Sequence, residues 1–290
     1  MINGKKKTVI ILVVLIGLNL AVWQIIFGLS QSQLLKIVFF DVGQGDAIFI
    51  ETPQKTQILI DGGSGVGSGS GIVEKLGKEL SFYDRDIDMV IFTHPDSDHI
   101  GGLVEVLKNY RAKIVGWPGV QSSQPLFQEF FNEADKAKSQ KVILTEGYKI
   151  YVGKELVIEV LSPGSDFIGK EVKDYNSSSL VLRIVYGENE FIITGDITKS
   201  VEKKIVNSGE NIASDVLKIS HHGSSTASSD IFLEKVKPGL AVIQVGKDNK
   251  YGHPESEVLE RLEKYGIKVM RTDELGDITM FSNGNKIEVR

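Results

Sequence analysis

The hydrophobic pattern begins with one long apolar segment close to the N-terminus. Residues 8–29 contain only two strongly polar side chains, Asn19 and Gln24, and they follow three lysines at positions 5–7. A helix of this length spans about 33 Å, which is enough to cross the hydrocarbon core of a membrane. The segment is longer than the apolar region of a signal peptide and ends without a small-residue cleavage pattern. We therefore expect residues 1–30 to form a single-pass anchor in the cell membrane, with residues 31–290 outside the cytoplasm.

Beyond residue 30, short apolar runs alternate with segments of helical periodicity, as in an α/β fold. We expect one domain over residues 31–290. The expected strands are residues 35–40, 47–51, 57–60, 89–92, 156–161, 180–185, 191–194, 216–219 and 241–245. The expected helices are residues 103–110, 127–137, 199–206 and 256–265. One biased stretch, residues 62–71, has six glycines in ten residues. Two interpretations of this stretch stay open: a mobile loop beside a site, or a plain solvated loop.

Charge and cysteine content exclude several classes of function. The formal net charge is −5, and because the first 30 residues carry three lysines and no acid, residues 31–290 carry −8. This balance argues against broad, charge-driven wrapping of nucleic acid. The chain has no cysteine, which excludes disulfides, thiolate metal sites and a cysteine nucleophile.

Potential metal ligands are concentrated directly after the strand at residues 89–92. His94, Asp96, Asp98 and His99 lie within six residues, between the end of a strand and the start of a helix. Ligands and catalytic groups gather at such strand ends in α/β folds. Helix capping would explain one acid, but not two acids together with two imidazoles. The segment therefore predicts a metal site.

Two later strands also end in groups that can bind metals. Asp196 follows the apolar run at 191–194, and the pair His221-His222 follows the run at 216–219. Each of these could be a turn or capping residue on its own. Because three apolar strands all end in such groups, we expect the groups to meet at one edge of the fold.

These motifs resemble those of the metallo-β-lactamase superfamily. The series is THPDSDHIGG at 93–102, ITGDI at 193–197 and LKISHHGS at 217–224. FFDVGQGDAIFIETP from residue 39, ILIDGG at 58–63 and KYGHPESEVLERL at 250–262 are similar to the ComEC-like branch, the extracytoplasmic hydrolase domains of competence proteins. The resemblance implies a four-layer αββα sandwich with two divalent metal ions at one edge, zinc or manganese, with magnesium as another option.

The resemblance also implies a set of metal ligands. They are His94, Asp96, Asp98, His99, Asp196 and His221. Asp196 is expected to bridge the ions, and Asp98 is also a catalytic candidate. His221 is preferred over His222 by its distance from the strand, because neighbouring side chains on a strand point in opposite directions. Asp96 stands where the fuller superfamily pattern has a histidine, and residues 100–220 contain no histidine.

Other residues are candidates for roles around the metals. Asn176 is expected either to take the place of the missing histidine or to support a metal ligand without binding the metal itself. Asp61 resembles an aspartate that orients a ligand imidazole; Asp46 has either this role or that of a tight turn. His222 is expected to orient a loop or contact substrate. His253 is a candidate to hydrogen-bond a substrate phosphate or protonate a leaving group.

The implied function is that of a membrane-anchored, metal-dependent hydrolase. A metal-bridging hydroxide would attack a phosphodiester, plausibly in DNA, in the context of DNA uptake. Another ester, such as a cell-wall phosphodiester, is an alternative, because the same chemistry serves many substrates. A non-catalytic metal-binding partner in a DNA-uptake apparatus is the second alternative.

Overall fold

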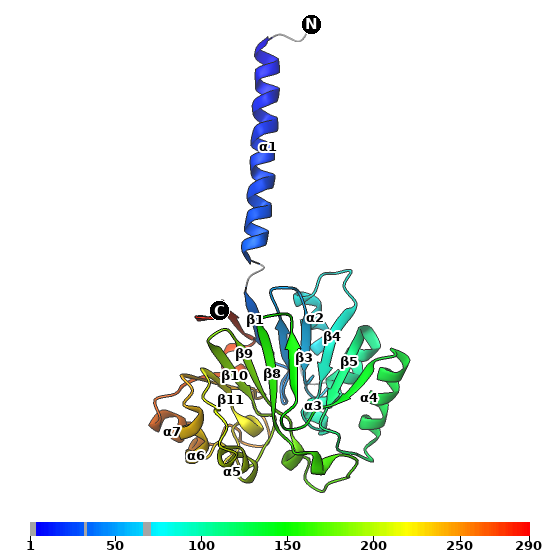
Figure 1. Ribbon diagram of the computed structural model, residues 1–290, viewed down its shortest axis with the longest axis vertical. Coiled ribbons are helices and arrows are strands. Elements are labelled where there is room, and N and C mark those ends of the chain that lie inside the picture. Colours follow the sequence, from blue (N-terminus) through cyan, green and yellow to red (C-terminus); the bar gives the residue numbers. More distant parts are fainter. Residues whose placement is uncertain (1–3, 32–33, 66–70) are drawn as a thin grey trace.

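The computed structural model describes residues 4–31, 34–65 and 71–290. Two β-sheets pack face to face, and helices cover the outer face of each sheet (Figure 1). This confirms the expected four-layer αββα sandwich. Residues 66–70 of the glycine-rich stretch lie outside the described residues, so both interpretations of that stretch stay open.

The first sheet has eight strands. In spatial order they are β15 (Ile287–Val289), β14 (Ile278–Ser282), β1 (Leu35–Phe39), β2 (Ile48–Glu51), β3 (Gln57–Ile60), β4 (Asp86–Ile91), β5 (Arg111–Trp117) and β6 (Gln140–Ile143). Its outer face packs against α2 (Ile72–Glu79), α3 (Ser97–Asn109) and α4 (Pro125–Lys136). Strands β3 to β6 are parallel, so their carboxyl ends lie at one edge.

The second sheet has seven strands. In spatial order they are β13 (Lys268–Arg271), β12 (Leu240–Ile243), β11 (Val216–Lys218), β10 (Asn189–Ile193), β9 (Val181–Tyr186), β8 (Leu156–Ser162) and β7 (Lys149–Val152). Its outer face packs against α5 (Lys199–Asn207), α6 (Asp230–Val236) and α7 (Ser256–Lys264). The short α8 (Thr272–Leu275) and three 3-10 turns, η1 (Ser165–Phe167), η2 (Tyr175–Ser178) and η3 (Ser220–Gly223), complete the chain.

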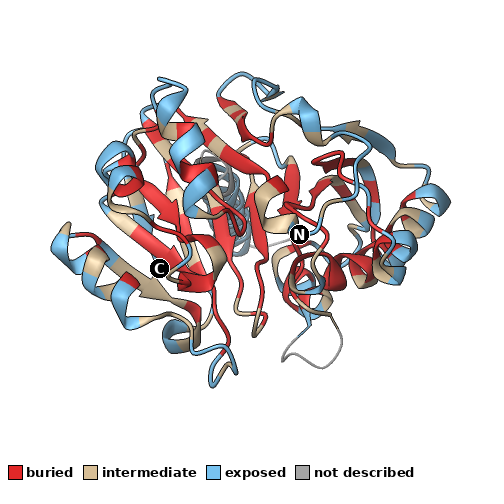
Figure 2. Cartoon of the chain, turned by 90° about the horizontal axis from the view of Figure 1, so that it is seen from below, coloured by how far each residue is buried: buried red, intermediate tan, exposed pale blue. Residues whose placement is uncertain are grey.

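Three hydrophobic layers hold the sandwich together. The middle layer lies between the sheets and joins side chains such as Ile37 and Phe191. Each outer layer joins one sheet to its helices, through Phe92 and Phe130 on one side and Val258 on the other. Figure 2 shows the result from the end opposite α1: buried residues fill the two sheets, and exposed positions lie on the outer faces of the helices. Strands buried on both faces explain why the sequence shows continuous apolar runs rather than alternation.

The apolar N-terminal segment forms the helix α1 (Gly4–Gln31). Residues 6–26 are long and apolar enough to cross a membrane by length and composition. The described side chains of α1 are exposed, and the helix extends away from the sandwich (Figure 1). An exposed apolar helix is typical of a membrane span and not of the buried core of a soluble domain.

The sandwich has two distinct ends. Strand β1 begins at Leu35, only four residues after α1 ends at Gln31, so this end lies next to α1. The turns between β2 and β3 and between β14 and β15 lie at the same end, because Lys36 pairs with Glu51 and Leu35 pairs with Ser282. The carboxyl ends of β1, β3 and β4 lie at the opposite end.

Candidate metal centre

The residues singled out from the sequence meet at the end of the sandwich opposite α1. They come from the turn after β1, the ends of β3 and β4, the first turn of α3, the end of β10 and the turn after β11. The buried members of this group are Asp46, Asp61, His94, His99, Asp196 and His222. Parallel strands thus bring distant segments of the chain to one edge.

Close backbone contacts fix the first turn of α3 against β3. Gly62 donates a backbone hydrogen bond to the carbonyl of His99, and Gly102 donates one to the carbonyl of Gly63. A Cβ on Gly102 would lie 1.9 Å from the Gly62 oxygen, so only glycine permits this approach. The two glycines that end THPDSDHIGG therefore position His99.

Asp61 holds the imidazole of His99 from behind. Its carboxylate accepts hydrogen bonds from His99 Nδ1 at 2.9 Å and from the backbone and hydroxyl of Thr93, both at 2.7 Å. The Thr93 hydroxyl oxygen also lies 3.0 Å from His94 Nδ1. Because the hydroxyl donates to Asp61, its oxygen is left to accept from His94. Both rings therefore carry their proton on Nδ1 and keep Nε2 available.

Three imidazole nitrogens lie around the carboxylates of the site. His99 Nε2 is 3.4 Å from Asp196 Oδ2, and His222 Nε2 is 3.5 Å from the same oxygen. His222 Nε2 also lies 3.4 Å from Asp98 Oδ2, and His94 Nε2 lies 3.5 Å from Asp96 Oδ2. Asp196 is thus central to the group.

The two adjacent histidines differ from the sequence-based expectation. Strand β11 ends at Lys218, so the pair lies in a turn, where both residues have a left-handed φ of 52°. His222 is buried among Asp98, His99 and Asp196, with its Nδ1 2.9 Å from the carbonyl of Gln244. His221 is more exposed, with its Nε2 3.9 Å from Asp196 Oδ2. The preference for His221 relied on an extended strand that this turn replaces, and it is His222 that joins the buried cluster.

Lys218 lies in the same cluster, although the sequence analysis did not select it. It is fully buried, forms an ion pair with Asp46, and has its Nζ 4.0 Å from Asp196 Oδ1. A lysine inside an apolar strand was the available signal, because lysine is almost never fully buried unless it is paired. Asp46 is therefore more than a turn residue: it also contacts His222, at 3.4 Å.

The charged groups of the site shift one another's pKa values. Burial alone would lower the pKa of His222, but Asp196, Asp46 and Asp98 raise that pKa to about 10. Burial alone would raise the pKa of Asp196, but His222 and His99 hold it well below its usual range. The pKa of His99 is raised well above its usual range by Asp196 and Asp61, against the effect of burial. Without a metal, protonated imidazoles thus neutralise the carboxylates.

A cavity of about 300 Å³ opens onto this cluster. Asp98, Asp196, His221 and His222 line its floor, and the remaining lining residues are Gln44, Asp96, Ser97, Gln124, Asn176, Tyr251 and His253. Asn176 and His253, both selected from the sequence, thus lie at the cavity. Burial lowers the pKa of His253, so this imidazole is neutral at pH 7. Tyr251 was not selected from the sequence, although it belongs to the same motif as His253.

The group fits divalent metal ions. The Nε2 atoms of His94, His99 and His222 and the Oδ1 atom of Asp196 are buried without a hydrogen-bond partner. Buried polar atoms are normally paired, so four in one place indicate a missing ligand. Ligand atoms about 2.1 Å from a tetrahedral metal lie about 3.4 Å apart. The Nε2 atoms lie 3.4 to 3.5 Å from the Oδ2 atoms of Asp96, Asp98 and Asp196, which is this spacing. Mixed imidazole and carboxylate donors suit zinc and manganese.

The family profile of the metallo-beta-lactamase superfamily matches residues 40–247. The chain belongs to this superfamily. Within it, the chain is similar to ComE operon protein 3 of Bacillus subtilis, at 32% identity over 256 residues, which are 84% of this chain and 32% of that protein. It is 33% identical over 238 residues to competence protein ComA of Neisseria gonorrhoeae, covering 82% of this chain and 31% of that protein. The expected ComEC-like resemblance is confirmed.

The chain spans about a third of the length of these curated relatives. Among solved structures it resembles Igni18, a metallo hydrolase from the archaeon Ignicoccus hospitalis, with a TM-score of 0.57 at 16% identity over 85% of this chain and 98% of that one. It also resembles CmlA, a diiron beta-hydroxylase from Streptomyces venezuelae, with a TM-score of 0.54 at 13% identity over 84% and 53% of the two chains. These likenesses show the fold. Because a hydrolase and a hydroxylase share it, the reaction must be argued from the site.

Proposed function

We propose that this protein is a membrane-anchored, metal-dependent phosphodiesterase that acts as a nuclease on DNA. The observation that carries the proposal is the set of unpartnered imidazole nitrogens around Asp196, at the floor of an open cavity. The competence proteins among the relatives support DNA as the substrate. The net charge of −5 means that affinity for a polyanion must come from local contacts, including the metals, and not from a broad basic face.

We assign the ligands to two positions that share Asp196. Asp98, His99 and His222 form the more complete position, and their ligand atoms lie within 4.8 Å of one another. His94 and Asp96 form the other, where His221, on the cavity side of Asp196, stands in for the missing histidine. When bound there, two divalent ions, zinc or manganese with magnesium as a further candidate, would supply a water of lowered pKa and neutralise charge on the attacked phosphate.

The surrounding residues orient the metal ligands and offer contacts to the substrate. Asp61, Thr93 and the Gln244 carbonyl keep a proton on the Nδ1 atoms of the three buried imidazoles, so that each Nε2 faces the centre. Neutral His253 at the cavity can donate to a phosphate oxygen or accept a proton there. Asn176 offers an uncharged amide on the same wall. The residues thus bind and orient a phosphodiester while the metals provide the positive charge.

The position of the site fits a substrate in water. We propose that residues 1–30 are the anchor and residues 31–290 a hydrolase domain outside the cytoplasm. The turn end of the sandwich is held near the membrane, because only three residues separate Gln31 from Leu35. The site lies at the other end, at least the length of the five-residue β1 away, or about 17 Å. The cavity therefore faces away from the membrane.

The decisive experiment is a hydrolysis assay of the full chain in detergent. The protein is stripped of metal, reloaded with Mn²⁺, Zn²⁺ or Mg²⁺, and given single-stranded and duplex DNA. We expect cleavage that requires metal and disappears in an Asp196→Asn variant that is equally folded by circular dichroism. Cleavage of bis(p-nitrophenyl) phosphate but of no DNA would favour another phosphodiester. Metal binding without any hydrolysis would favour the non-catalytic partner in a DNA-uptake apparatus.

The orientation of the anchor needs its own test. A reporter fused after Arg290 is expected to be active only outside the cytoplasmic membrane and to remain with the membrane fraction. A cytoplasmic or released reporter would overturn the proposed topology.

A further inference from the structure

An exposed aromatic ring stands at the mouth of the site cavity. Tyr251 lines this cavity together with His253 and Asp196, yet its own relative exposure is 56%. The ring stacks on His253 with centroids 5.9 Å apart and an interplanar angle of 26°. His253 in turn contacts His221 edge-on at 5.6 Å. A short series of rings thus runs from the ligand cluster to the surface, and it ends in Tyr251.

The loop that presents this ring is ordered by one side chain. Asn249 donates hydrogen bonds to the carbonyls of Gly246 and His253, and its Oδ1 accepts from the backbone N–H groups of Tyr251 and His253. The backbone after the loop is tied to the histidine turn, because Glu255 donates to the carbonyl of Gly223. Tyr251 is therefore held in place before any ligand arrives, which lowers the entropic cost of using it.

We infer that Tyr251 is a stacking platform for a nucleobase next to the scissile phosphate, so that the preferred substrate is single-stranded nucleic acid. The inference rests on the proposed nuclease function and specifies its substrate. Bases in a duplex are stacked on one another, and only an unpaired base offers its face to a protein ring. A phosphodiester without a base would gain nothing from Tyr251.

The charges at the mouth agree with this assignment. Lys250 is the neighbour of Tyr251, and its Nζ lies 5.3 Å from the centre of the tyrosine ring. An exposed cation–π contact of this kind is worth about 2- to 5-fold in an equilibrium constant. Stacking of a base on an aromatic ring is worth about 5- to 150-fold. An incoming base therefore displaces the ammonium group, which is then free to meet a backbone phosphate.

The stacking role is tested with two strands that carry the same backbone charge. One is a single-stranded DNA oligonucleotide, and the other replaces its bases with abasic sites. For the metal-loaded wild-type chain, we expect kcat/KM to be about 5- to 150-fold higher on the strand with bases. Tyr251→Ala should abolish this preference, so that the ratio of the two rates falls to about one. Tyr251→Phe should behave as wild type, because it keeps the ring.

The matched control is Tyr83→Ala. Tyr83 is 86% exposed and lies before β4, at the opposite end of the sandwich, so its loss should change neither rate. If Tyr251→Ala cleaves both strands as the wild type does, the stacking role is wrong while the nuclease function stands. If the wild type cleaves the two strands equally, base recognition is wrong. If it cleaves neither strand but hydrolyses bis(p-nitrophenyl) phosphate, the nuclease function fails, and the stacking role with it.

Discussion

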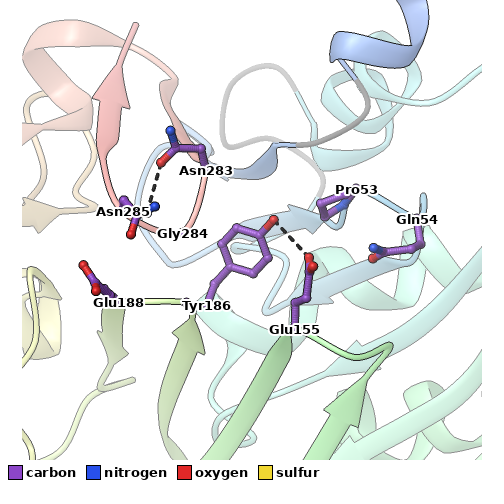
Figure 3. Close-up of a pocket in the computed structure, with 9 residues that line it drawn as sticks. Pro53, Gln54, Glu155, Tyr186, Glu188, Asn283, Gly284 and Asn285 are labelled. Atoms are coloured by element: carbon purple, nitrogen blue, oxygen red, sulfur yellow. Dashed lines mark hydrogen bonds between the residues drawn. The ribbon is translucent and has the colours of Figure 1, made fainter.

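The two ends of the sandwich carry two different kinds of cavity. The cavity at the ligand cluster has a volume of about 300 Å³, whereas a cavity at the end next to α1 reaches about 580 Å³. Figure 3 shows that the larger one lies among hairpin turns, with Pro53 and Gln54, Glu155, Tyr186 to Glu188, and Asn283 to Asn285 around it. Of these two cavities, the one next to α1 is the larger.

The polar groups of the two cavities differ in burial and in hydrogen bonding. Around the larger one, Glu155, Glu188 and Asn283 are exposed to water. The Asn283 side chain accepts from the backbone N–H of Asn285, and the Tyr186 hydroxyl donates to Glu155. At the smaller one, imidazole and carboxylate atoms are buried without partners. Buried, unpartnered polar atoms cost free energy, and a bound metal ion recovers it. This cost, and not volume, distinguishes a site for chemistry from a gap between turns.

The largest effect is expected when His222 and His221 are mutated one at a time. His222→Ala should lose the metal held with Asp98 and His99, and activity should fall to the level of the metal-free protein. His221→Ala should keep that ion but weaken the position formed with His94 and Asp96, and activity should fall by more than the about 10- to 100-fold typical of residues that only support a ligand. Elemental analysis and hydrolysis rates on equally folded variants measure both effects. If His221→Ala empties this position and His222→Ala does not, the assignment of the pair is reversed.

The next effect concerns stability and the buried lysine. Lys218→Met removes the ion-pair partner of the buried Asp46 carboxylate and leaves only His222 beside it, so the free energy of unfolding should fall by about 3–5 kcal/mol. Adding Asp46→Asn should restore part of this loss. The control is Lys113→Met, which removes an exposed pair with Asp88 and should cost less than about 1 kcal/mol. Urea unfolding in chelator gives the three values. An unchanged Lys218→Met variant would contradict the buried ion pair.

Metal affinity at this end should depend on pH. The pKa of His222 is raised to about 10, so the metal-free protein carries a proton there at pH 7. Only the neutral imidazole binds a metal, and the proton must leave. The affinity for Mn²⁺ should therefore rise by about tenfold per pH unit between pH 6 and 8, and further if His99 also releases a proton. Calorimetry in two buffers of different ionisation enthalpy measures the protons released. Affinity independent of pH would contradict this charge state.

Much of the fold was predictable because the core strands are buried on both faces. Residues 57–60 were predicted as a strand and form β3 (Gln57–Ile60). Strand β5 was not predicted, because Arg111 and Lys113 interrupt its apolar positions; both face solvent and pair with acids on β4. Whether this segment forms a strand depends on its pairing with β4 rather than on its own hydrophobic pattern.

The site was predictable as a set of motifs but not in its details. Strand ends and residue types brought together His94, Asp98, His99 and Asp196. Which histidine of the pair is buried depends on a turn of two left-handed residues, a conformation that non-glycine residues seldom adopt and that costs free energy. Periodicity carries no information about such a turn. The role of Lys218 depends on Asp46, which lies 172 positions earlier in the chain and meets it only after the sheets pack.

The smallest effects are expected at the larger cavity. Glu188→Ala removes an exposed carboxylate from a turn. Glu155→Ala removes an exposed carboxylate that accepts from the Tyr186 hydroxyl, and water in the cavity can replace this acceptor. Each should therefore alter the free energy of unfolding by no more than about 0.5 kcal/mol. Hydrolysis rates should stay at the wild-type level, because these residues lie at the end of the sandwich opposite the metal centre. The same assays as for His222→Ala apply. A tenfold loss of activity in either variant would show that the two ends cooperate, and cavity volume would then have been the better guide.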